Sequence, residues 1–117
     1  MKATAFGKYL RKLRIEKEML LKEMAETLNV SSAYLSSLEL GKKSISDAVI
    51  NKICSAFSLN KEQQDKLKEL AMRSQPSVKI DLVGKSNEDR EVVMSFARRY
   101  ESLSEEDRKK VMKMLGE

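Results

Sequence analysis

The sequence lacks several residue types on which whole classes of protein depend. Its 117 residues include no histidine, no tryptophan and a single cysteine, Cys54. The absence of histidine removes the commonest general base and the commonest metal ligand. One cysteine can form neither an internal disulfide framework nor a cysteine-rich zinc site. No carboxylate pair at diagnostic spacing and no glycine-rich phosphate loop replaces them, so we expect no catalytic site, no metal and no cofactor.

Proline, glycine and long apolar runs are also scarce. The chain has one Pro and four Gly, and its apolar residues mostly recur three or four positions apart, which is typical of helices. No apolar run approaches the length of a signal peptide or a membrane span. We therefore expect an all-α cytoplasmic protein without membrane contact. Its length favours one compact domain, or one domain with a short appendage.

The positive charge of the chain is confined to its first part. The formal net charge is +5. Residues 1–75 contain 14 Lys or Arg against 9 Asp or Glu, whereas residues 76–117 contain 9 of each kind. A local excess of positive charge is expected of a phosphate-binding surface, although charged helix surfaces are also ordinary. The excess favours nucleic acid as a partner when a DNA-binding motif lies in the same part of the chain.

Five helices are predicted in this first part, over residues 4–17, 21–28, 32–39, 47–57 and 61–73. Ser31, Ser46 and Asn60 precede the last three helices, and their side chains can accept a hydrogen bond from an unpaired N–H at a helix start. Gly41 ends the third helix because glycine adopts the left-handed conformation at little cost. Asn29, between the second and third helices, tolerates the same conformation.

The second and third of these helices form the most informative stretch. The apolar spacing is helical from Leu21 to Leu28, breaks at Asn29, and resumes from Ser31. This pattern predicts two short helices joined by a tight turn, each with one buried face. Small residues lie on the outer face of the second helix of the pair: Ser32, Ala33, Ser36 and Ser37. A helix held in this way suits insertion into the major groove of DNA.

The pattern changes at Pro76. This change divides the chain into a predicted DNA-binding domain at residues 1–75 and a second part at residues 76–117, which we expect to dimerise or to bind a partner. Two helices are predicted in the second part, over residues 87–102 and 105–115, each preceded by a serine that can cap it.

A short strand is predicted before these two helices. Residues 77–82 alternate apolar and polar side chains, with Val78, Ile80 and Leu82 on one side. A lone strand needs a partner, so pairing with the same strand of a second copy would make a dimer through these three residues. The alternative is an extended linker whose apolar side chains pack on the helices.

Two segments carry a resemblance to a known family: FGKYLRKLR at residues 6–14 and EMAETLNVSSAYLSSLELGK at residues 23–42. With them the chain resembles the phage-repressor (Cro-like, or XRE) helix-turn-helix family over roughly residues 6–73. The resemblance implies a five-helix bundle in which the second and third helices read DNA. It also implies that Arg14 and Glu39 form a charged pair, buried between the first helix and the end of the third.

The resemblance also assigns roles to surface residues. It implies base contacts at residues 32, 33 and 37, and helical spacing adds a fourth residue, so the candidates are Ser32, Ala33, Ser36 and Ser37. Serine hydroxyls pair with several bases and an alanine can touch a thymine methyl, so we expect modest specificity. Phosphate contacts are expected from Lys42 and Lys43, with Lys22, Tyr34 and Ser44 as further candidates. Tyr34 could instead pack beside the second helix.

Four positions depart from the family pattern, and one of them is Asn29, which replaces the glycine of the turn. Glu18 stands where a glycine often ends the first helix, and Leu20 stands where a serine or threonine usually caps the second. Leu21 stands where a glutamine often contacts a phosphate. Lys22 could take over that contact, or the two leucines could widen the core or meet a partner protein.

Two functions fit these observations. The first is a sequence-specific regulator of transcription, a homodimeric repressor of double-stranded DNA with half-sites about 10 bp apart. The second is an antitoxin-type or peptidase-partnered interaction protein that regulates its own operon, with residues 76–117 binding the toxin or peptidase. A toxin or metallopeptidase gene beside its own gene would favour the second.

Overall fold

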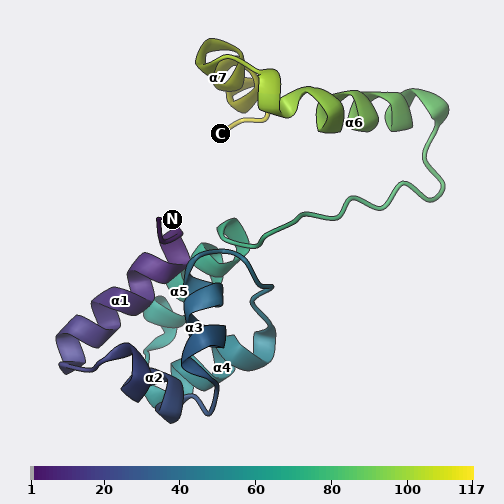
Figure 1. The fold of residues 1–117 in the computed structure, drawn as a ribbon. Coiled ribbons are helices and arrows are strands. Elements are labelled where there is room, and N and C mark those ends of the chain that lie inside the picture. The colour runs from purple at the N-terminus through teal and green to yellow at the C-terminus, as the bar shows by residue number, and fades with distance from the viewer. Residues whose placement is uncertain (1) are drawn as a thin grey trace. The chain divides into compact units, whose positions relative to one another are not determined.

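The computed structural model describes residues 2–117. They form seven α-helices and one short 3₁₀ helix in two compact units (Figure 1). The first unit ends at Val78, and the second runs from Lys79 to Glu117. Residues 2–117 contain no strand. The prediction of an all-α chain with a helix-turn-helix in its N-terminal part is therefore confirmed.

The first unit contains five helices: α1 (Ala5–Lys17), α2 (Leu21–Thr27), α3 (Ser32–Glu39), α4 (Asp47–Ala56) and α5 (Lys61–Arg73). Their ends lie within a residue of those that the periodicity predicts. The expected caps are present, since Ser31 Oγ accepts from the Tyr34 N–H at 3.0 Å and Ser46 Oγ from the Val49 N–H at 3.2 Å. Asn60 caps α5 in the same way at 2.8 Å.

Three of the tight turns use left-handed backbone. Gly41, just after α3, has φ +74°, and Asn29, between α2 and α3, has φ +57°. Glu18, after α1, has φ +53°. This conformation costs a residue with a Cβ atom about 1–2 kcal/mol, so Glu18 occupies a position that glycine would fill with less strain.

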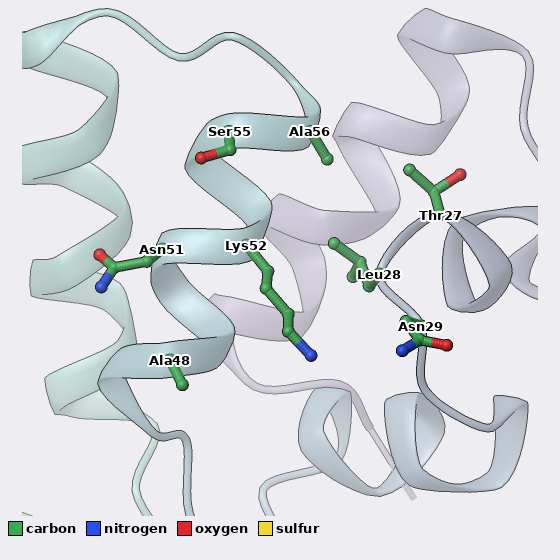
Figure 2. A pocket seen from close by; sticks show the side chains of 8 residues that line it. All are labelled: Thr27, Leu28, Asn29, Ala48, Asn51, Lys52, Ser55 and Ala56. Atoms are coloured by element: carbon green, nitrogen blue, oxygen red, sulfur yellow. The ribbon is translucent and has the colours of Figure 1, made fainter.

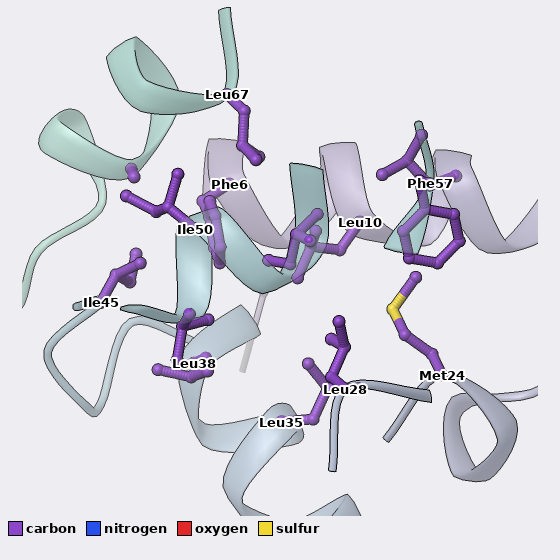
Figure 3. Close-up of a cluster of buried hydrophobic side chains, with 14 of the residues drawn as sticks. Phe6, Leu10, Met24, Leu28, Leu35, Leu38, Ile45, Ile50, Phe57 and Leu67 are labelled. Carbon is purple, nitrogen blue, oxygen red and sulfur yellow. The ribbon is translucent and has the colours of Figure 1, made fainter. Parts of the chain in front are cut away.

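The apolar faces of these helices meet in one core (Figure 3). Every buried hydrophobic residue of the described chain lies between Phe6 and Ala71. α1 packs against α3 and α5, and α2 packs against α3. The third helix is thus held from two sides, and its remaining face is exposed.

The second unit contains α6 (Asn87–Arg99), a 3₁₀ helix (Tyr100–Ser102) and α7 (Glu105–Met114). The helix predicted over residues 87–102 is present, but its last turn tightens into the 3₁₀ form. Serine side chains cap both α-helices as expected. No residue between Lys79 and Glu117 is buried, so this unit has no core of its own.

The strand expected over residues 77–82 is wrong for this chain. These residues form no regular secondary structure. A strand exists through hydrogen bonds to a neighbouring strand, and the described chain offers no second extended segment to pair with. Val78 and Ile80 are 87% and 57% exposed and Leu82 is half-buried, so the first two do not pack on the helices either.

Candidate nucleic-acid interface

The third helix presents a face of small side chains to solvent. Leu35 and Leu38 are fully buried and fix the opposite face of α3 in the core. Ala33 is exposed, and the three serines among the predicted base-contacting residues, Ser32, Ser36 and Ser37, are half-exposed. The structure therefore brings the four residues to one accessible side of α3, with no large side chain among them.

One of these hydroxyls is already engaged within the helix. Ser37 Oγ donates to the Ala33 carbonyl oxygen at 3.0 Å. Its lone pairs still accept hydrogen bonds, so in this arrangement Ser37 is an acceptor. The side chains of Ser32 and Ser36 have no hydrogen-bond partner within residues 2–117. Both can donate or accept.

A buried ion pair orients the end of α3. Glu39 is 2% exposed, and its carboxylate accepts hydrogen bonds from both terminal nitrogens of Arg14, with Arg14 Nη2 lying 3.1 Å from Glu39 Oε1. The Arg14 side chain is 11% exposed. Two parallel bonds of this kind fix the relative orientation of the two side chains as well as their distance. The pair therefore joins α1 to the last residue of α3.

Arg11 is a third member of this cluster that the sequence analysis missed. Its Nε lies 3.4 Å from Glu39 Oε1, and its side chain is 51% exposed. Arg11 precedes Arg14 by three residues, so the two share one face of α1. That spacing was available in the sequence as a signal. The exposed guanidinium adds positive charge close to the end of α3.

Residues at the start of α1 also contact the end of α3. The backbone N–H and Oγ1 of Thr4 both donate to the Glu39 carbonyl oxygen, at 3.0 and 3.1 Å. Gly7 lies against the same peptide, because a Cβ atom at Gly7 would come within 2.9 Å of Glu39 C and Cα and closer still to its carbonyl oxygen. Only glycine permits this approach. The orientation of α3 thus depends on backbone contacts as well as on the ion pair.

A basic loop follows α3. Lys42, Lys43 and Ser44 are all exposed, and the next residue, Ile45, is buried. Gln75, the last residue of the predicted DNA-binding domain, fixes this loop. Its Oε1 accepts from the Ile45 N–H, and its Nε2 donates to the Ile45 carbonyl oxygen, both at 2.9 Å. Gln75, two residues beyond α5, thereby anchors the loop that carries three of the predicted phosphate-contacting residues.

The start of α2 contributes one exposed cation. Lys22 lies in the first turn and is exposed. Leu20 is 70% exposed, whereas Leu21 packs against the core. The Leu20 N–H donates to Glu23 Oε1 at 2.9 Å, which is one half of a capping box. The other half is missing, because leucine has no side-chain oxygen to accept from an N–H at the start of α2. Tyr34 also packs partly against the core, which limits the part of its side chain that can reach a phosphate.

A shallow cavity of about 550 Å³ lies between the α2–α3 turn and α4 (Figure 2). The side chains of Thr27, Asn51 and Ser55 line it, and Lys52 is its one charged lining residue.

Residues 2–117 bring together no group of three or more His, Cys, Asp or Glu side chains that could hold a metal ion. In the same part of the chain, no helix has both the length and the apolarity needed to cross a membrane.

Part of the first unit matches a known protein family. Residues 10–64 match the HTH_3 helix-turn-helix family, from within α1 to the beginning of α5. Searches of curated proteins and of solved structures gave no significant match. The matched segment contains α2, α3 and the basic loop, and it ends before Gln75 and the second unit. Residues 10–64 are therefore a helix-turn-helix domain of the XRE/Cro-like family, a DNA-binding domain.

Proposed function

We propose that this protein is a sequence-specific regulator of transcription, a homodimeric repressor that acts in the cytoplasm without an enzymatic activity. Each copy would insert α3 into the major groove of double-stranded DNA. The observation that carries the proposal is the exposed small-residue face of α3, fixed on its other side by Leu35 and Leu38 and at its end by Glu39. A rigidly held helix can read base edges because its side chains keep one register along the groove.

The proposed contacts fall into two groups. Base contacts come from Ser32, Ala33, Ser36 and Ser37. Phosphate contacts come from Lys42, Lys43 and Ser44, with Lys22 and Tyr34 at the other end of the motif. Phosphate contacts set position and affinity, whereas base contacts set sequence choice. No Arg, Asn or Gln lies on α3 to make a bidentate base contact, so we expect a short, tolerant half-site.

Selection of bound fragments from the organism's own DNA, read by sequencing, tests this proposal. We expect enrichment of a palindrome whose half-site centres lie about 10 bp apart, because two copies related by a two-fold axis meet successive major grooves on one side of the duplex. A palindrome beside the protein's own gene would indicate autoregulation. Binding that enriches no sequence at any salt concentration would contradict a sequence-specific regulator.

The salt dependence of binding tests the phosphate contacts separately. If each copy neutralises about four to six phosphates, the logarithm of the association constant falls by about 0.9 per phosphate with the logarithm of salt. Replacing both Lys42 and Lys43 by alanine should lower that slope by about 2 per half-site. The matched control replaces Lys109 and Lys110, an adjacent pair outside the helix-turn-helix domain, and should leave the slope unchanged. Equal slopes for both double variants would refute the assignment.

A second candidate function is an antitoxin-type or peptidase-partnered protein that regulates its own operon. The observation that favours it is the second unit, where Val92, Phe96 and Leu115 are 69%, 51% and 69% exposed. Large exposed apolar surfaces commonly mark protein–protein contact sites. The oligomeric state of the purified chain separates the two candidates, because a partner-dependent unit would leave the chain alone monomeric. The role predicted for Val78, Ile80 and Leu82 in dimerisation stays a prediction.

A further inference from the structure

We propose that α6 pairs in antiparallel orientation with α6 of a second copy of this chain, and that this pairing makes the dimer. The inference rests on the proposed function, because a palindromic operator requires two copies, and it adds the surface that joins them. Three observations carry it: an uncovered apolar stripe, a charge pattern complementary to itself, and the electrical neutrality of residues 76–117.

The apolar stripe begins at Val92, in the middle of α6, and ends at Tyr100 in the 3₁₀ helix that follows. Val92, Phe96 and Tyr100 follow one another at four-residue spacing, and their side chains are 69%, 51% and 50% exposed. The rings of Phe96 and Tyr100 lie 6.4 Å apart between centroids, so they share one face. Val93 and Ala97 extend the same face by helical spacing. A 13-residue helix is marginal in water on its own, so covering this face would stabilise α6.

The charges beside the stripe change sign along the helix. Glu88 lies in the first turn of α6, and Arg99 lies in the last. Glu88 and Arg99 are eleven residues apart, about three helical turns, so they lie on the same flank of the stripe at opposite ends. One flank of α6 is therefore acidic at its start and basic at its end.

This pattern is complementary to itself in one arrangement. When a two-fold axis relates two antiparallel helices, each flank meets the same flank of the partner helix, with the ends reversed. Glu88 of one copy then faces Arg99 of the other, and the pair occurs twice. In a parallel pair, Glu88 of one copy and Arg99 of the other would lie at opposite ends, about three helical turns apart, and would not meet. A second copy of this chain thus supplies both the apolar face and the opposite charges that α6 needs.

The neutrality of the second part agrees with self-association. Residues 76–117 contain 9 basic and 9 acidic residues. Two copies can approach through this part without net repulsion, while the positive charge of residues 1–75 stays available for DNA. A strongly acidic or basic partner would find no opposite net charge here to attract it.

Charge reversal in the full-length chain tests the inference. We expect Glu88→Arg and Arg99→Glu each to weaken dimerisation on the order of tenfold, because each variant replaces two attractions by two repulsions. Mixing the two variants should restore dimers as heterodimers, since each reversed residue then faces an opposite charge. The matched controls are Glu91→Arg and Arg98→Glu, which lie on the opposite face of α6 by helical spacing and should leave the dissociation constant unchanged. Analytical ultracentrifugation and native mass spectrometry of single and mixed samples give the readout.

Two results would overturn the inference. The wild-type chain could stay monomeric at all concentrations, or the dimer could keep the same dissociation constant in the Glu88→Arg and Arg99→Glu variants. Restoration by mixing separates pairing from misfolding, because a variant that fails to fold gains nothing from the other. DNA binding of the wild-type chain is measured alongside. Pairing through α6 without DNA binding would refute the proposed function and leave this inference standing. DNA binding by a dimer that pairs through another surface would refute this inference and leave the proposed function standing.

Discussion

The two units of this protein use apolar residues in opposite ways. In the first, the stripes of five helices converge on one core, and residues such as Phe6 and Leu35 are completely buried. In the second, α6 carries a comparable stripe, yet no residue from Lys79 to Glu117 is buried. Two short helices cannot enclose each other's apolar faces, whereas five can. The first unit therefore buries its hydrophobic side chains within the chain, whereas the second leaves them exposed, where a surface from outside could cover them.

Several of the buried polar contacts of the first unit lie at the end of α3. Glu39 meets Arg14 and Arg11 through its side chain and Thr4 through its carbonyl oxygen. Gly7 lies against the same peptide. The helix that we expect to read DNA is therefore held at its end by both side-chain and backbone contacts. Breaking these contacts one at a time measures how much of the stability of the first unit depends on them.

The largest effect is expected from Glu39→Ala. This change leaves Arg14 without its buried partner, and breaking such a pair typically costs about 3–5 kcal/mol in the free energy of unfolding. Chemical denaturation of the full chain measures it. The matched control is Glu16→Ala, an exposed carboxylate on α1, which should change stability by less than about 0.5 kcal/mol. Equal stability of the two variants would show that the pair does not support the fold.

A smaller loss is expected from Gly7→Ala. The added methyl group would meet the Glu39 backbone, which cannot move aside as a flexible side chain could. Overpacking of this kind costs about 1–3 kcal/mol. Lys8→Ala, on the exposed neighbouring residue, serves as the control, since lysine and alanine are both good helix formers. A Gly7→Ala chain as stable as the control would mean that α1 and α3 lie further apart than described.

Gln75→Ala should cost about 1–2 kcal/mol, because it removes two hydrogen bonds to Ile45 and leaves that peptide unsatisfied. The same change should weaken DNA binding, since the loop of Lys42 and Lys43 loses its anchor. Denaturation and binding at fixed salt concentration measure the two effects. Ser77→Ala, at an exposed position nearby, should change neither. Lower stability without weaker DNA binding would show that the loop does not need Gln75.

The smallest effect on stability is expected from ending the chain at Val78. Because the second unit contributes no buried residue, the thermal unfolding midpoint of the first unit should not change measurably. The shortened chain should be monomeric and should bind a single half-site with the salt dependence of one copy. A large drop in the midpoint would mean that the second unit supports the first. Retained dimers would place the dimer contact within α1 to α5.

Local chemistry made most of the fold predictable. Helix ends follow from side chains such as Ser31 and Asn60, which act within three residues, and apolar spacing identifies the buried faces. The strand over residues 77–82 failed for the opposite reason. Alternation of side chains is a local property, but a strand forms only through hydrogen bonds to a distant segment, and the described chain provides none.

The residues of the interface that contact each other across the sequence were predictable only where the family resemblance indicated which positions pair. The pairing of Arg14 with Glu39 crosses 25 residues and came from the resemblance, not from spacing. Gln75 and Ile45 lie 30 residues apart, and nothing in either position indicates the contact. Gly7 likewise looks like an ordinary helix residue until the backbone of Glu39 is placed against it. These residues depend on which helices cross, which only the structure supplies.

Amide hydrogen exchange of the full chain at a low and a high protein concentration tests the central contrast most directly. Exchange reports the free energy of local opening for each element. We predict that protection of α1 to α5 is the same at both concentrations, and that protection of α6 rises with concentration because the helix is stabilised by a second copy. Equal protection of α6 at both concentrations would contradict the account, since the second unit would then not depend on pairing.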